Sequence, residues 1–295
     1  MIPIIDYKNG GEKTIERILS RSQLDYGNVQ EIVDGILTDV RKNGDKAVFE
    51  YTKKFDAVDI DKNSIVVSDE EIKYAYSQVK PELLEIIKKS AQRIKDFHQK
   101  QKRNSWFETS ENGEIMGQMV RPLENVGVYV PGGKAAYPSS VLMNVMPAHV
   151  AGVKNIYMTT PAQKDGRVYP TTIVAAMEAG VNKIFKVGGA QAIAALAYGT
   201  ESIPKVDKIC GPGNIFVAIA KKSVYGHVNI DSVAGPSEIL IVADGTANPV
   251  YVAADLLSQA EHDELASAIL ITPDEKLAYS VQKELEKQTA VLERK

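Results

Sequence analysis

The feature that most constrains the fold is a regular alternation of short apolar runs with helical segments from about residue 126 onward. Strands that alternate with helices of this length are joined by right-handed crossovers and form mostly parallel sheets. The pattern therefore predicts an α/β protein. The expected strands are 126–130, 156–160, 183–187, 206–210, 227–231, 238–242 and 268–272, and the expected helices are 139–150, 171–179, 191–198, 215–223, 249–259 and 275–288.

The first quarter of the chain predicts charged, amphipathic helices. Apolar residues recur at helical spacing over 29–40, and Asn43-Gly44 is a stop signal. Asp45 opens a second helix towards Phe55, Ser68 with Glu71 fits a capping box, and Pro81 suits the first turn of another helix. Further on, Asn112-Gly113 between two apolar runs indicates a β-hairpin. We interpret the helices as scaffold without a chemical role.

Composition and charge exclude several classes of protein. The chain has 295 residues and a formal net charge of -3, which gives no general electrostatic reason to bind nucleic acid. Its single cysteine, Cys210, cannot form an internal disulfide. The longest uncharged stretch, 135–153, contains Pro138 and Pro147 and is a poor membrane helix, and the N-terminus is unlike a signal peptide. We expect a cytoplasmic protein with no membrane partner.

Four glycine-containing turns follow four of the expected strands: 131–133, 188–191, 211–214 and 234–238. Glycine turns let backbone N–H groups approach a ligand, and a following helix N-terminus favours anions. A single turn of this kind is more often only a tight turn. Together they favour a nucleotide or phosphate crevice. The dinucleotide pattern Gly-x-Gly-x-x-Gly is missing, because Phe216 stands where the third glycine belongs after Gly211 and Gly213.

A second group of candidate residues lies at the end of the helix expected over 249–259. Gln259 and His262 are three residues apart and hence neighbours on one face, so both could reach one cation. Two ligands do not complete a zinc site, and the alternative is that His262 only complements the helix dipole. Among the other histidines we expect His98 to be solvated, His149 to be packed in the core and His227 to have no partner.

Several segments, taken in order, resemble the histidinol dehydrogenase family. Ile230 to Glu238 followed by Ala253 to His262 is similar to the family signature. The glycine turns of the same family resemble the segments 128–133, 187–192 and 210–214. The resemblance covers essentially the whole chain and is most specific from Tyr129 to His262.

This resemblance implies an enzyme that oxidises L-histidinol through L-histidinal to L-histidine, the last steps of histidine biosynthesis, with two NAD+ and one zinc ion per site. Tyr129, Gln191 and Asn214 match cofactor-binding positions for NAD. Ser237 matches a substrate contact, and Gln259 and His262 match two zinc ligands that also face the substrate. The metal would position the substrate rather than generate hydroxide.

The resemblance also implies two Rossmann-like lobes preceded by a helical N-terminal arm. The arm would be 1–25, one discontinuous lobe 26–128 plus 239–295, and the inserted lobe 129–238. The family forms intertwined homodimers whose C-terminal tails complete each other's sites. Its catalytic Glu-His pair and its other two zinc ligands, an aspartate and a histidine, would lie beyond Lys295. We therefore expect the sequence to be incomplete and the 295 residues to be inactive alone.

Two other interpretations stay open at this point. A paralogue could use the same scaffold on another small polar alcohol, because substrate identity depends on residues beyond Lys295. A non-catalytic remnant could bind nucleotide or pair with a complete partner. Reading the gene downstream would separate the enzyme from the remnant.

Overall fold

The structure is a computed structural model that describes residues 2–7, 10–20, 27–132, 136–233, 237–261 and 266–292. Its contacts divide the chain into two compact units. One unit comprises Gly27–Val233, and the other comprises Met1–Tyr26 together with Ala234–Lys295. Each unit has a hydrophobic core of its own.

The unit Gly27–Val233 is built on a five-stranded parallel sheet in the order β5-β4-β3-β6-β7. The chain forms β3, moves outward through β4 to β5, and then returns across β3 to form β6 and β7. This is the strand order of a doubly wound sheet, whose ligand crevice lies where the order reverses, here between β3 and β6. The strands are β3 (Asn125–Tyr129), β4 (Asn155–Thr159), β5 (Lys183–Phe185), β6 (Lys208–Cys210) and β7 (Asn229–Ile230).

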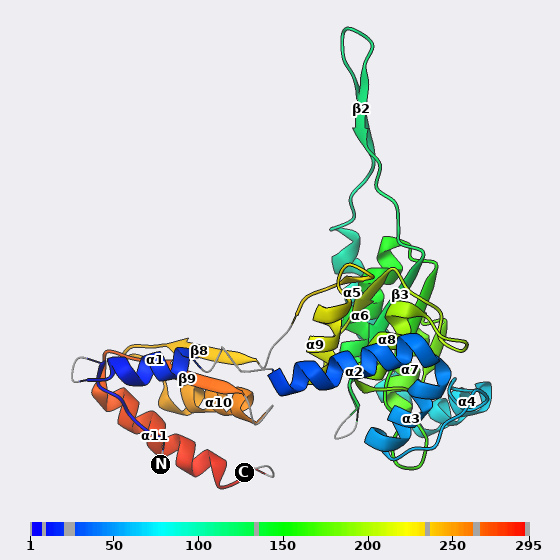
Figure 1. The fold of residues 1–295 in the computed structure, drawn as a ribbon. Helices are drawn as coiled ribbons and strands as arrows, with labels where there is room; N and C mark the ends of the chain where they lie inside the picture. Colours follow the sequence, from blue (N-terminus) through cyan, green and yellow to red (C-terminus); the bar gives the residue numbers. More distant parts are fainter. Residues whose placement is uncertain are drawn as a thin grey trace. The chain divides into compact units, whose positions relative to one another are not determined.

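Helices cover both faces of this sheet (Figure 1). On one face α6 and α7 pack together, with α4 and α5 outside them. On the other face α8 and α9 pack together, with α2 and α3 against them. The helices are α2 (Gly27–Asn43), α3 (Asp45–Asp56), α4 (Asp69–Gln78), α5 (Pro81–Gln99), α6 (Pro138–Ala151), α7 (Pro170–Ala179), α8 (Gly189–Tyr198) and α9 (Ile215–Val224).

Local signals in the sequence explain where several of these helices begin and end. Gly44 has φ 54°, a left-handed conformation that separates α2 from α3. Ser68 accepts a hydrogen bond from the backbone N–H of Glu71, and the Glu71 side chain accepts one from the Ser68 N–H, which completes the expected capping box before α4. Pro81 occupies the first turn of α5, as expected.

A two-stranded hairpin projects from the body of this unit (Figure 1). It consists of β1 (Trp106–Thr109) and β2 (Ile115–Gln118), which pair antiparallel around a turn where Gly113 has φ 85°. The Asn-Gly signal therefore predicted it correctly. All eight of its strand residues are exposed, including Trp106, Phe107 and Ile115.

The second unit contains a smaller parallel pair of strands. β8 (Glu238–Val242) and β9 (Ser267–Ile271) pair in register and are joined through α10 (Pro249–Ala260). Side chains of α10, among them Leu256, pack against Leu277 and Leu285 of α11 (Glu275–Thr289). The N-terminal segment with α1 (Glu12–Ser20) belongs to the same unit, where the Gln282 side chain donates to the Ile2 carbonyl.

The architecture confirms an α/β fold with mostly parallel sheets and a helical N-terminal region. The compact units group the chain differently from the expected domains, since Met1–Tyr26 belongs with Ala234–Lys295. The helices of residues 27–99, expected with the C-terminal segment, lie with the sheet of β3 to β7, because α2 packs on α8 and α9 and α5 packs on α6. Among the described residues, no helix is long and apolar enough to span a bilayer.

The surroundings of the histidines differ in part from those expected from the sequence. His149 is exposed in the last turn of α6, so the expectation of a packed core residue is wrong. A position in the last turn of a helix lets an imidazole complement the dipole from solvent. His227, expected to lack a partner, makes an edge contact with the Tyr198 ring at 5.8 Å between centroids. His98 is half-buried and hydrogen-bonds Gln101.

Candidate functional site

A cavity of about 870 Å³ opens at the carboxyl ends of the strands in the unit Gly27–Val233. Its volume lies within the range of small-molecule sites, roughly 300–1,000 Å³. Three of the expected glycine turns contribute to it through Pro131, Gly132, Gly189 and Asn214. The remaining lining residues come from α2, α3, the end of β3, the loop after β4, α8 and α9: Ile36, Phe55, Asp56, Tyr129, Pro161, Ala162, Gln163, Lys164, Asp165, Ala190, Gln191 and Phe216.

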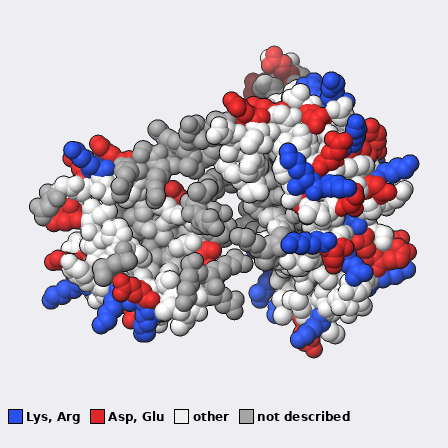
Figure 2. Space-filling model, turned by 60° about the horizontal axis from the view of Figure 1, so that its bottom comes forward, with Lys and Arg blue, Asp and Glu red and all other residues white. Residues whose placement is uncertain are grey.

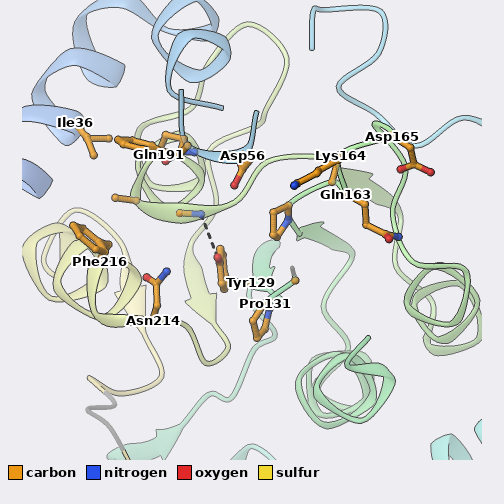
Figure 3. Close-up of a pocket in the computed structure, with 16 residues that line it drawn as sticks. Ile36, Asp56, Tyr129, Pro131, Gln163, Lys164, Asp165, Gln191, Asn214 and Phe216 are labelled. Carbon is orange, nitrogen blue, oxygen red and sulfur yellow. Dashed lines mark hydrogen bonds between the residues drawn. The ribbon is translucent and has the colours of Figure 1, made fainter. Parts of the chain in front are cut away.

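The three residues expected to contact NAD, Tyr129, Gln191 and Asn214, lie together in this cavity (Figure 3). They come from three separate elements, the end of β3, the first turn of α8 and the N-terminus of α9. Parallel strands end at one edge of the sheet, which explains why residues so distant in sequence meet here.

Tyr129 connects two of the glycine turns. Its hydroxyl accepts a hydrogen bond from the backbone N–H of Gly189 at 3.2 Å, shown by the dashed line in Figure 3. Burial raises the pKa of the Tyr129 phenol to about 12, so the group is neutral at ordinary pH. Its O–H is free to donate to a ligand in the cavity, because the hydroxyl is used here as an acceptor.

Gln191 is the most unusual residue in the cavity. The side chain is 1% exposed, and neither its amide oxygen nor its amide nitrogen has a hydrogen-bond partner among the described residues. A buried polar group left unpaired costs about 1–3 kcal/mol. Gly189 has φ 64°, and a Cβ there would lie 2.6 Å from the Gln191 Oε1. The backbone therefore makes room for this amide.

Asn214 begins α9. Its side-chain oxygen accepts a hydrogen bond from the backbone N–H of Val217 at 3.1 Å, which caps the helix, and the residue itself is exposed to the cavity. The preceding Gly211 has φ 119°, and a Cβ at this position would collide with the carbonyl oxygen of Tyr129. Only glycine allows the turn to approach β3 so closely.

An ion pair between the buried Lys221 and the solvent-accessible Asp231 holds this turn in place. Lys221 on α9 is 2% exposed, and its ammonium donates to the Gly211 carbonyl at 2.9 Å and to the Asp231 carboxylate. Asp231 also accepts from the backbone N–H of Gly211 at 2.8 Å. Both backbone groups of Gly211 are therefore bonded by one charged pair, which fixes the position of Asn214 three residues later.

Asp56 is a cavity residue that sequence reasoning missed. It is the last residue of α3, and its Oδ2 atom is buried with no hydrogen-bond partner within the described ranges. Burial raises the pKa of the Asp56 carboxyl to about 6. We interpreted α2 and α3 as scaffold, and this is wrong, because Ile36, Phe55 and Asp56 all line the cavity. The available signal was an acidic residue at a helix C-terminus, where the dipole disfavours negative charge.

Two exposed charged residues of the loop after β4 lie on another side of the cavity. Figure 3 shows the amino end of Lys164 directed towards Asp56, with Asp165 pointing away. The Asp165 side chain accepts from the backbone N–H of Arg167 at 3.0 Å. On the outer surface, the face in Figure 2 carries acidic and basic side chains interspersed.

The cavity fits a dinucleotide such as NAD. Its walls are partly apolar, through Ile36, Phe55 and Phe216, and a few convergent polar groups remain available for a ligand. The unpaired amide of Gln191 and the unpaired oxygen of Asp56 are the observations that call for a ligand.

The residues expected at the zinc and substrate site belong to the other unit. Gln259, in the last turn of α10, is half-buried, and its amide nitrogen is buried without a partner. Ser237 is exposed immediately before β8. His262 lies outside the described residues. Because α10 runs back between two parallel strands, its C-terminal end and the start of β8 lie at the same edge of this sheet.

The described residues do not by themselves make a zinc site. Within the described ranges, no group of three or more His, Cys, Asp and Glu side chains is placed to hold a metal ion. Gln259 offers a single amide donor, whereas structural and catalytic zinc ions take at least three protein ligands.

Comparisons with known proteins identify the family of the chain. A family model described as histidinol dehydrogenase matches residues 19–295. The chain is 56% identical to histidinol dehydrogenase of Clostridium acetobutylicum over 97% of its own length and 66% of that protein. It is 52% identical to that of Lactococcus lactis subsp. lactis over 100% of this chain and 68% of that protein.

A solved structure agrees as well. The crystal structure of histidinol dehydrogenase from Elizabethkingia anophelis matches with a TM-score of 0.82 at 44% identity. The match covers 90% of this chain and 61% of that one. The chain thus spans roughly two thirds of the length of the relatives it matches.

Proposed function

Because the chain belongs to the histidinol dehydrogenase family, we propose that it binds NAD in the cavity of the unit Gly27–Val233 and takes part in oxidising L-histidinol to L-histidine. The proposal is supported above all by Gln191, whose buried amide has no hydrogen-bond partner in the part of the chain that the structure describes. A dinucleotide offers hydrogen-bonding groups that would satisfy it.

The cavity residues have distinct tasks in this proposal. Gln191 donates to and accepts from the cofactor, Tyr129 donates its hydroxyl, and Asn214 contacts the cofactor from the start of α9. NAD+ supplies the hydride acceptor for both oxidation steps. The apolar side chains of Ile36, Phe55 and Phe216 reduce the water around the bound cofactor. Positioning of this kind supplies much of the rate enhancement in a two-reactant step.

We further propose that Ser237, Gln259 and His262 hold the substrate, with Gln259 and His262 as two ligands of a zinc ion. Support comes from the family resemblance and from the unpaired Gln259 amide. These residues match the family's ligand positions, and the catalytic Glu-His pair and two further ligands of the family have no match in these 295 residues. Acting alone, the 295 residues would therefore turn over histidinol at a negligible rate.

A homodimer is part of the same proposal. The β1–β2 hairpin carries exposed apolar side chains, including Trp106, Phe107, Ile115 and Met116. Exposed apolar patches on this scale often mark protein–protein contacts. Sedimentation velocity of the unaltered chain and of a Trp106→Ser/Phe107→Ser variant tests this, because a monomer at all concentrations in both proteins would contradict it. The net charge of -3 gives no general reason for nucleic acid to bind, and we propose a cytoplasmic location.

Calorimetric titration of NAD into the chain tests the proposed function. We expect saturable binding, and Gln191→Leu should weaken it about tenfold or more, because the substitution removes hydrogen bonds that would be buried with the ligand. Lys222→Met, which changes an exposed residue of α9, serves as control and should bind NAD normally. Absence of NAD binding would contradict the proposed NAD site. Histidinol-dependent NADH production at a normal rate would contradict the claim that these 295 residues alone turn over histidinol at a negligible rate.

A further inference from the structure

We propose that Asp56 accepts hydrogen bonds from the ribose hydroxyls of the dinucleotide and makes this cavity selective for NAD over NADP. The inference rests on the proposed NAD cavity and adds to it the residue that determines cofactor choice. Asp56 lines the same cavity as Tyr129 and Gln191, and it reaches the cavity from α3, whereas Tyr129 comes from β3 and Gln191 from α8.

The first argument is the unpaired oxygen. Asp56 Oδ2 is buried, and no group among the residues that the structure describes donates a hydrogen bond to it. An ionised carboxylate only accepts hydrogen bonds, so its partner has to be a donor. A ribose diol provides two adjacent O–H donors, and an acidic side chain that accepts from them is the usual device in dinucleotide sites.

The second argument is the cost of keeping a carboxyl here. Asp56 ends α3, where the partial negative charge of the helix C-terminus repels a carboxylate. Burial disfavours the charge as well and raises the pKa of Asp56 to about 6. No ion pair with Lys or Arg relieves it among the residues that the structure describes. A carboxylate that is disfavoured by both the helix dipole and burial, and that has no ion-pair partner among the described residues, is best explained by a role in ligand binding.

The third argument concerns the 2′-phosphate of NADP. A carboxylate at the ribose repels this dianionic group and leaves it without a hydrogen-bond donor. Lys164, whose amino end points towards Asp56 in Figure 3, would attract the phosphate once the carboxylate is gone. Asp56 therefore makes this part of the cavity prefer NAD over NADP.

A rival residue is present. Asp165 follows β4, the second strand of the doubly wound sheet and the place where such folds commonly carry the ribose-binding acid. Asp165 is exposed, however, and its carboxylate already accepts a hydrogen bond from the Arg167 N–H. Asp165 therefore needs no ligand to satisfy its carboxylate, and Asp165→Asn serves as a comparison variant for Asp56→Asn.

Calorimetric titration of NAD and of NADP at pH 8 tests the inference on the full chain, with Asp56→Asn, Asp165→Asn and Asp59→Asn. Asp59 lies three residues after Asp56, is exposed and forms a surface ion pair with Lys53, so Asp59→Asn is the matched control. For the unaltered chain we expect NAD to bind more tightly than NADP. Asp56→Asn should weaken the binding of NAD about tenfold or more, because it removes a hydrogen bond to a charged group. It should also bring the affinities for NAD and NADP closer together.

The possible results separate this inference from the proposed function. If the unaltered chain binds NAD and Asp56→Asn changes neither the affinity nor the ratio, this inference is overturned and the NAD cavity stands. If only Asp165→Asn changes the ratio of NAD to NADP affinity, the inference is overturned and Asp165 is the residue that selects the cofactor. If the unaltered chain binds no NAD, both proposals fall. A folded Asp56→Asn protein, checked by its unfolding transition, that loses NAD affinity while Asp59→Asn retains it supports the inference.

Discussion

Asp56 and Gln191 occupy positions that make the ligand-free protein less stable. Asp56 places a carboxylate oxygen, and Gln191 a whole amide, in buried surroundings without partners. Surrounding structure that is stable enough to hold them can carry such costs, and functional sites are where they accumulate. Removing either group should therefore stabilise the free protein while harming binding.

Asp56→Asn should raise the unfolding temperature of the ligand-free chain at pH 8 and leave it nearly unchanged at pH 4. The folded-state pKa of Asp56 is raised from 3.8 to about 6, so the folded state binds the proton more tightly. Stability from this group is present below pH 4 and is lost as the pH rises through 6. Asparagine does not titrate and avoids that loss. Thermal unfolding followed by circular dichroism checks this, and a variant less stable than the parent at pH 8 would contradict it.

Gln191→Leu should raise the stability of the ligand-free chain by about 1 kcal/mol, because leucine needs no hydrogen bond and has a similar volume. Urea unfolding measures the change. NAD should then protect the unaltered chain against unfolding but give this variant little protection. Destabilisation by 2 kcal/mol or more would mean that the amide has a partner within the folded protein.

Single residues also show where reasoning from sequence stops. Tyr129, Gln191 and Asn214 were identified through a family resemblance, and the structure places all three in one cavity. Asp56 lies on a helix that shows only a charged amphipathic pattern, and its burial depends on how α3 packs against α8, a contact between segments far apart in the chain. His149 was misjudged for the same reason, because an apolar helix does not reveal which side faces solvent.

At the scale of elements, the turn between β6 and α9 depends on the Lys221–Asp231 pair. Lys221→Met should destabilise the chain by about 2 kcal/mol, because it removes the hydrogen bonds that the buried ammonium donates to the Gly211 carbonyl and to the Asp231 carboxylate, while the carboxylate itself still reaches solvent. It should also weaken NAD binding, because Asn214 loses its fixed position. Lys222→Met, one residue on and exposed, is the control for urea unfolding and for NAD titration. Equal stability of the two variants would show that the turn holds without the ion pair.

Elements could be predicted well because their signals are local. The capping box at Ser68, the hairpin at Gly113 and the strand–helix alternation all depend on residues a few positions apart. The parallel sheet and its crevice followed from that alternation. Which helices cover which face did not, because α2 and α5 pack on α8 and α6 through contacts between distant segments.

At the scale of the whole molecule, the two units have separate cores. The described cavity residues all lie within Gly27–Val233, whereas Gln259 and Ser237 lie in the other unit. The expected division into an inserted lobe of 129–238 and a discontinuous lobe would leave α2 and α3 outside the nucleotide-binding part. The contacts of this chain instead put both helices in the unit that forms the cavity.

A fragment of residues 27–233 should therefore fold by itself and bind NAD with the affinity of the full chain. It contains a five-stranded sheet covered on both faces, the core around it, and every cavity residue that the structure describes. Cooperative thermal unfolding and calorimetric titration check this, with Gln191→Leu in the same fragment as the negative control. A fragment of 129–238, which lacks α2 and α3, should unfold at lower temperature and bind NAD weakly, because it loses Ile36, Phe55 and Asp56. If the shorter fragment instead bound NAD as well as the longer one, α3 would have no part in the site.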